Sequence, residues 1–89
     1  MPTISMFYGV IIRMYHFDTQ QHSSPHIHVV YQGCTAVMEI PSGRFIESSL
    51  PSNKARLVRA WIEIHQDELM ANWALAVVGE PIFKIEPLR

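Results

Sequence analysis

The sequence contains a single cysteine, only four glycines and no large excess of either charge. Because Cys34 has no second cysteine to pair with, no disulfide forms within the chain, and we interpret it as a small apolar residue. Its neighbours Gly33 and Thr35 supply no cation to activate a thiolate. The chain has 7 lysines and arginines and 8 aspartates and glutamates, which gives a formal net charge of −1. The overall charge therefore does not support nucleic-acid binding, and any basic patch must be small.

Long hydrophobic runs are also absent, since no apolar stretch approaches the roughly 20 residues of a membrane span. The apolar run near the N-terminus lacks the basic segment before it and the small-residue cleavage site after it that mark a signal peptide. We therefore expect a cytoplasmic protein that does not associate with membranes. No cofactor-binding motif stands out, and we expect no cofactor.

Hydrophobic residues nevertheless make up 48% of the 89 residues, which is typical of a folded protein. The length predicts a single domain over residues 1–89. A domain of this size buries only a modest core, so an oligomeric partner would add to its stability.

Residues 7–17 (FYGVIIRMYHF) are rich in β-branched and aromatic types and predict a first strand, with Gly9 as a bulge or a point of close approach. A polar connection follows, and residues 26–31 (HIHVVY) then alternate in polarity as a second strand does. A short strand at residues 44–47 follows the turn at Pro41.

A two-residue hairpin loop at Gln32-Gly33 is predicted to join the strand at 26–31 to the strand after it. Such a loop pairs residue 31 with residue 34, and the register runs back until residue 26 faces residue 39. Apolar residues then lie opposite one another on one face of the hairpin, whereas a slip of one residue would mix the two faces.

After Pro51 the apolar residues recur at spacings of three and four, which predicts a helix that begins at a cap at Ser52 or Asn53 and stops at Gly79. The pattern leaves open whether this is one long helix or two helices with a break near His65. Residues 82–85 alternate in polarity, which leaves a short C-terminal strand as an open alternative.

Together these elements predict an α+β fold, in which an antiparallel meander sheet of about four strands is followed by one long or broken α-helix packed on one face. The residues expected in the core are Val10, Ile12, Ile27, Val29, Met38, Leu57, Trp61, Leu69 and Trp73.

Six motifs distributed along the chain are PTISMFYG at residues 2–9, IRMY at 12–15, SPHIHVVY at 24–31, RLVRAW at 56–61, ANWALA at 71–76 and EPIFKIEPL at 80–88. Together they resemble a family of small, uncharacterised bacterial proteins, domain of unknown function 4160. The resemblance implies no established reaction. It implies a dedicated partner protein, because members are often encoded beside another small protein in an arrangement similar to toxin–antitoxin pairs.

The chain departs from the pattern of that family at three places. Relatives usually have two prolines where this chain has Ser24-Pro25, and a phenylalanine where Ile27 stands. They also tend to be charged where this chain has the apolar residues 75–78.

His26 and His28 lie on one face of their predicted strand, and the register places Glu39 opposite His26. Two imidazoles and a carboxylate are a ligand set for zinc, or for an iron site with two histidines and one carboxylate. His22, in the preceding loop, offers a further nitrogen. Against this hypothesis, side chains two residues apart on a strand begin about 7 Å from each other, so convergence on one ion demands favourable rotamers.

The same two histidines are alternatively the general acid and base of a metal-free ribonuclease, with Arg13 or Arg44 stabilising a phosphate. Tyr15 and Tyr31 would then stack on bases or orient the scissile phosphate. The scattered positive charges argue against this hypothesis, because small ribonucleases generally hold their substrate on a cationic face.

We favour a third interpretation, in which the two histidines have no chemical role and occupy an exposed or partner-facing sheet face. His65 is interpreted as structural as well, because it shares a face of the predicted helix with Trp61 and Leu69.

Residues 69–78 (LMANWALAVV) contain only one polar residue, and a helix end that is apolar all round must be covered on more than one side. We therefore predict an interface with a second copy of the chain or with the product of a neighbouring gene, formed by Met70, Trp73, Leu75, Val77 and Val78. The function expected is that of a small protein-interaction module in a toxin–antitoxin-like pair. The alternatives are the ribonuclease and, third, a metal-binding protein.

Overall fold

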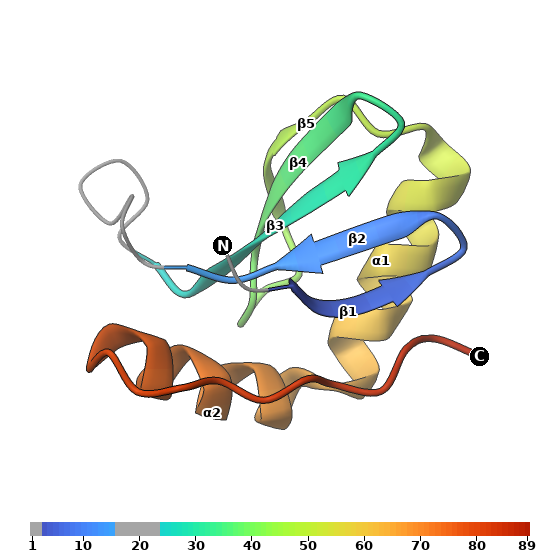
Figure 1. The fold of residues 1–89 in the computed structure, drawn as a ribbon. Coiled ribbons are helices and arrows are strands. Elements are labelled where there is room, and N and C mark those ends of the chain that lie inside the picture. The colour runs from blue at the N-terminus through green and yellow to red at the C-terminus, as the bar shows by residue number, and fades with distance from the viewer. Residues whose placement is uncertain (1–2, 16–23) are drawn as a thin grey trace.

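The computed structural model describes residues 3–15 and 24–89, which form an antiparallel sheet followed by two helices (Figure 1). The sheet has five strands in the order β1-β2-β3-β4-β5, so the predicted meander is confirmed. The strands are β1 (Thr3–Phe7), β2 (Val10–Arg13), β3 (His26–Tyr31), β4 (Cys34–Glu39) and β5 (Phe45–Ser48).

The hairpin of β3 and β4 has the register expected from its alternation, running from His26 opposite Glu39 to Tyr31 opposite Cys34. Its two loop residues both have positive φ, 45° at Gln32 and 80° at Gly33. Two left-handed residues in succession form the type I′ turn, whose twist matches that of the flanking strands.

The single first strand predicted over residues 7–17 is wrong, because the chain turns at Tyr8 and Gly9 and makes two strands. Tyr8 has φ 49° and Gly9 has φ 80°, and Phe7 pairs with Val10. A Cβ atom at Gly9 would lie 3.3 Å from the ring of Tyr31, so the predicted close approach is confirmed. The extra turn gives five strands in place of about four; residues 16–17 of the predicted strand lie outside the described residues.

The helical region is divided into α1 (Ser52–Ile64) and α2 (Gln66–Val77), which answers the question that the sequence pattern left open. The break lies at His65, whose φ of −109° and ψ of 24° are not helical. Its backbone N–H still donates to the carbonyl of Trp61, and its own carbonyl accepts a hydrogen bond from Leu69. The chain therefore changes direction without leaving these backbone groups unpaired.

The predicted N-terminal cap is wrong, whereas the predicted C-terminal stop is confirmed. Pro51 occupies the cap position with no side-chain hydrogen bond, and helix α1 already includes Ser52. At the other end, Gly79 has φ 76°, and the N–H groups of Gly79 and Glu80 donate to the carbonyls of Ala76 and Leu75. This pair of bonds is the Schellman motif, which requires a left-handed residue after the helix.

The C-terminal tail forms no strand, so the alternative of a closing strand at residues 82–85 is not realised. The tail lies along α2 and returns toward β1 (Figure 1). The Ile85 N–H donates to the carbonyl of Ile4 at 2.8 Å, and the Trp61 indole Nε1–H donates to the carbonyl of Glu86 at 2.8 Å. These bonds attach the tail to the sheet and to α1.

The core lies between one face of the sheet and the two helices. Of the residues predicted for it, all but Leu57 are buried, and Leu57 is partly buried and packs against the others. Helix α1 crosses the sheet face, and α2 lies beside the end of the sheet where β3 begins (Figure 1). The Gln66 amide fixes this position by donating to the carbonyls of Ile40 and Pro41, at 2.9 Å and 2.8 Å.

Candidate functional site

His26, at the start of β3, is completely buried. Its Nδ1 lies 2.7 Å from the Ser24 carbonyl oxygen, so Nδ1 carries the hydrogen that is donated, because a carbonyl only accepts. The ring of Trp73 packs against the imidazole, with 4.9 Å between the ring centroids. Helix α2 thus covers a histidine that the sequence placed among exposed or partner-facing residues, and that expectation is wrong for His26.

His28 lies two residues further along β3 and is half-buried. The ring of Tyr15 stacks on it with a centroid distance of 4.2 Å and an interplanar angle of 11°. Arg13 on β2 is its register partner, and the His26 ring is 5.1 Å away. The structure therefore brings together four of the residues considered for acid–base chemistry, although only His28 of the two histidines has exposed surface.

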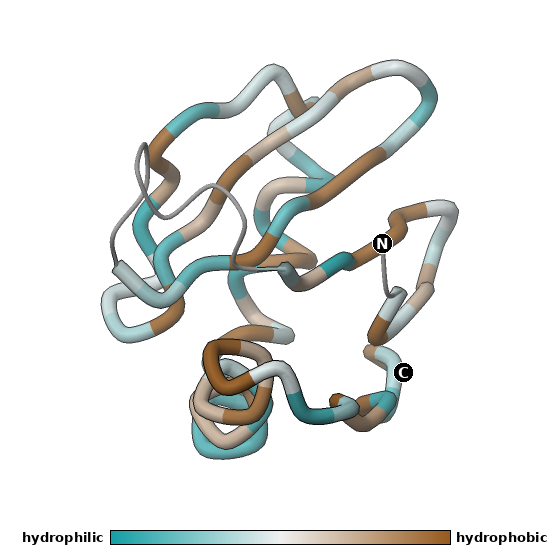
Figure 2. Tube along the Cα trace, turned by 60° about the vertical axis from the view of Figure 1, so that its left-hand side comes forward, coloured by the Kyte–Doolittle hydropathy of each residue, from teal (hydrophilic) through white to brown (hydrophobic). Residues whose placement is uncertain are grey.

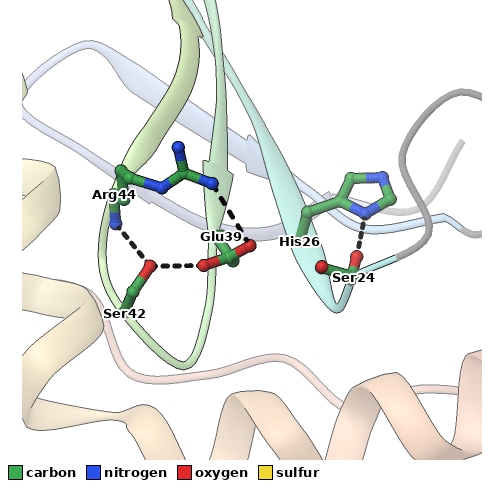
Figure 3. Close-up of polar contacts among 5 residues, drawn as sticks. All are labelled: Ser24, His26, Glu39, Ser42 and Arg44. Atoms are coloured by element: carbon green, nitrogen blue, oxygen red, sulfur yellow. Dashed lines mark hydrogen bonds and ion pairs between the residues drawn. The ribbon is translucent and has the colours of Figure 1, made fainter.

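Glu39 is paired with His26 in the strand register, but the two side chains interact with different groups (Figure 3). The Ser42 hydroxyl donates to Glu39 Oε1 at 2.6 Å, and Arg44 Nη2 lies 3.7 Å from Oε2. The hydrogen bond from Ser42 is the largest cause that lowers the pKa of Glu39 below its ordinary value, with desolvation opposing it and Ser24 and Arg44 adding to it. Glu39 therefore stabilises the turn between β4 and β5.

The proposed metal ligands His26, His28 and Glu39 do not form a metal centre in the described residues. In residues 3–15 and 24–89, no group of three His, Cys, Asp or Glu side chains is placed to hold an ion. The further candidate ligand, His22, lies outside those ranges. The metal hypothesis thus gains no support from the geometry.

His65 has the structural role expected from the sequence. It lies at the junction of α1 and α2, and its ring is 5.5 Å from that of Trp61. Its Nδ1 is 2.6 Å from the carboxylate of Glu68 in the first turn of α2. These contacts connect the last turn of one helix to the first turn of the next.

Beyond Glu68, helix α2 buries its polar side chain and exposes apolar ones, which is the reverse of the usual arrangement. The one polar residue in that part of the helix, Asn72, is only 3% exposed, and its amide forms two hydrogen bonds with the backbone of Phe83. All the residues exposed from position 69 to the C-cap are apolar. They are Met70, Ala71, Ala74, Val77 and Val78, and we call them the α2 outer surface.

Only part of the predicted interface belongs to this surface. Met70, Val77 and Val78 are 37%, 48% and 69% exposed. Leu75 is half-buried, and Trp73 is 8% exposed because it packs against His26. Trp73 was predicted both for the core and for the interface, and the structure places it in the core.

The tail extends the apolar area beside α2. Phe83 is 71% exposed, although its backbone is attached to Asn72. A cavity of about 240 Å³ lies between the helix and the tail, with Ala71, Leu75 and Phe83 among its lining residues. In Figure 2 hydrophobic segments, coloured brown, continue around the last turns of α2.

Asn72 has a structural role that the sequence analysis did not predict. Its position in an apolar run marked it only as the exception, yet it decides which side of α2 packs against the tail. A lone amide in an apolar helix is a signal for such an anchor, because a buried amide requires partners.

The fold and these sites define a small α+β protein with an antiparallel meander sheet and two helices. A family model, described as a domain of unknown function (DUF4160), matches residues 9–74, and the chain belongs to this family. No curated protein and no solved structure matches the chain. Within the described residues no helix combines the length and the apolar composition needed to cross a bilayer.

Proposed function

We propose that this protein is an interaction module that binds another protein through the α2 outer surface. The observation that carries the proposal is the inverted polarity of α2, in which the polar Asn72 is buried and apolar side chains face outward. Isolated apolar residues on a surface are ordinary, but a contiguous apolar face is typical of an interface. The charged residues expected in relatives at positions 75–78 are replaced here by apolar ones, which favours the same conclusion.

The energetics require contacts beyond the helix alone. Burial of a Val or Met side chain contributes about 1.5–3 kcal/mol, and the loss of translational and rotational freedom on association offsets a large part of that sum. Phe83 and the cavity beside it supply additional apolar contacts next to the helix. A partner with an apolar side chain that enters this cavity, and an apolar face that packs on the α2 outer surface, would bury both surfaces.

We take the partner to be a separate protein, encoded beside this one in a toxin–antitoxin-like arrangement. The test measures the affinity of the purified chain for the neighbouring gene product by isothermal titration calorimetry. We expect Val77→Asp to weaken binding at least about tenfold, since it places a charge in the apolar contact. Ala60→Asp is the matched control, because it adds the same charge at an exposed position of α1.

Equal affinities for the native chain and Val77→Asp would contradict the proposal. So would a chain that stays monomeric by sedimentation and gains no mass with the neighbouring product. A homodimer that Val77→Asp dissociates would keep the α2 outer surface as an interface and replace the separate protein with a second copy.

A histidine-dependent ribonuclease is the second candidate function, because Arg13, Tyr15 and His28 lie together. With His26 buried, His28 is the group that would exchange a proton with a substrate. The test is RNA cleavage by the native chain and by the His28→Ala variant. Equal cleavage by both proteins, or none by the native chain, would end this hypothesis.

A further inference from the structure

Arg13 carries a positive charge that no described residue neutralises. The side chain is half-buried on β2, and its Nε is buried without a hydrogen-bond partner. Among the ion pairs formed by the described residues, none includes Arg13. Buried polar atoms nearly always have a partner, and a cation withdrawn from water without a counter-charge is costly.

Three other described arginines and lysines, Arg44, Arg89 and Lys54, differ from Arg13. Arg44 is 69% exposed and lies beside Glu39, and Arg89 pairs with Glu86 at 2.8 Å. Lys54 lies over the ring of Tyr31 and donates to the carbonyl of Tyr8. Each of these charges has a protein partner or ready access to water. Of the two arginines considered for a phosphate, the structure therefore favours Arg13 over Arg44.

Groups that bind anions surround Arg13 on the sheet face away from the core. His28 is its register partner on β3, and Thr3 is its register partner on β1. Residues directly opposite each other on antiparallel strands share a face and begin about 5 Å apart. Tyr15 stacks on His28, which restricts the orientation of the imidazole opposite Arg13 in the register. A guanidinium and an imidazole thus lie on adjoining strands, with the hydroxyl side chain of Thr3 opposite Arg13 on β1 and that of Tyr15 just after β2.

We infer that Arg13, together with His28, binds a phosphate group. A guanidinium donates to two oxygens of an oxyanion through its planar fork. The two oxygens of a carboxylate would be occupied by that fork alone. A phosphate keeps further oxygens for the imidazole and a hydroxyl, so it matches the larger set of donors. The inference concerns binding and depends neither on the α2 outer surface nor on RNA cleavage.

The test is a titration of the ¹⁵N-labelled chain with inorganic phosphate, followed by NMR at the Arg13 side-chain N–H and the His28 ring. We expect saturable shifts at both groups. Arg13→Met should weaken binding at least tenfold, whereas Arg56→Met, which removes an exposed arginine from α1, should leave it unchanged. A second titration with a nucleoside 5′-monophosphate separates the sources: tighter binding than phosphate identifies a nucleotide ligand, and equal binding identifies phosphate itself.

The absence of shifts at Arg13 and His28 in both titrations would overturn the inference. Equal affinities in Arg13→Met and Arg56→Met would overturn it too, because the ion would then be adventitious. If Arg13→Met fails to fold, Arg13→Lys keeps the charge and removes the fork, and it should also bind phosphate more weakly. Unchanged binding by that variant would contradict the proposed role of the guanidinium.

Discussion

Asn72 and Phe83 are joined by two hydrogen bonds between one side chain and one backbone unit. The Asn72 Nδ2 donates to the Phe83 carbonyl at 2.7 Å, and the Phe83 N–H donates to Asn72 Oδ1 at 3.0 Å. The amide thus forms with the Phe83 backbone the two hydrogen bonds that a neighbouring strand would otherwise provide. It also orients α2, because burying Asn72 turns Met70, Val77 and Val78 outward.

Replacement of Asn72 by alanine should destabilise the protein by about 2–4 kcal/mol. Both hydrogen bonds are lost, and the partly buried backbone groups of Phe83 lose their partner, which costs about 1–3 kcal/mol for each buried group left unpaired. Urea unfolding followed by circular dichroism measures the difference. Asn53→Ala, at an exposed position of α1, should change stability by less than about 0.5 kcal/mol. Equal stabilities of the two variants would contradict the role of the amide.

A comparison of alanine substitutions at Gly9 and Gly33 measures how much the contact with the Tyr31 ring at Gly9 costs in stability. Both have φ 80° at the second position of a two-residue loop, so alanine suffers the same backbone strain of about 1–2 kcal/mol at each. A Cβ at Gly9 would also meet the ring of Tyr31 at 3.3 Å, whereas nothing lies within 4 Å at Gly33. We expect Gly9→Ala to be the less stable variant in thermal unfolding. Equal stabilities would show that the Tyr31 ring moves away from the new Cβ at no cost, and the reverse order would contradict the assumption that the two loops carry the same strain.

The Ser42 hydroxyl should control the acidity of Glu39, since its hydrogen bond is the largest cause of the lowered pKa. We expect Ser42→Ala to raise the pKa of Glu39 more than Arg44→Met does, as read from the carboxyl ¹³C shift during a pH titration. Because the folded-state pKa is depressed, this carboxylate stabilises the fold above its ordinary pKa, and the contribution is lost as the pH falls through the folded value. An unchanged pKa in Ser42→Ala would refute this assignment.

The two histidines of β3 should differ in their effect on stability. His26 is completely buried and contacts Ser24 and Trp73, so His26→Ala removes a packed ring and leaves a cavity, at a cost of about 2–4 kcal/mol. His28 is half-buried, so we expect a smaller loss from His28→Ala in the same urea experiment. Equal or reversed losses would show that the burial of His26 does not contribute as the structure indicates.

The elements predicted correctly from the sequence are those whose determinants are close together in the chain. Alternation over residues 26–31 and the Gln32-Gly33 loop define the β3–β4 register without any distant residue. Gly79 determines the end of the helical region in the same way. The turn at Tyr8 and Gly9 was missed because tyrosine rarely adopts positive φ, and the apolar residues on both sides resemble one continuous strand.

The site depended more on contacts between distant residues. Alternation placed His26 and His28 on one face of β3, but the packing of Trp73 from α2 buries only His26. The register placed Glu39 opposite His26, yet the carboxylate of Glu39 accepts a hydrogen bond from Ser42 and forms an ion pair with Arg44. A pattern of residue types cannot rank such competing partners, because the choice follows from distances that exist only in the folded chain.

By itself the sequence determined the α+β class, the meander order, the central hairpin and nearly all of the core, because periodicity and turn chemistry act over a few residues. Only the tertiary structure decided the break at His65, the burial of His26, the absence of an ion pair between Arg13 and any described residue, and the outward side of α2. The last part of α2 is apolar all round, so its sequence favours no direction of packing. The position of the tail and the two bonds from Asn72 to Phe83 make that choice.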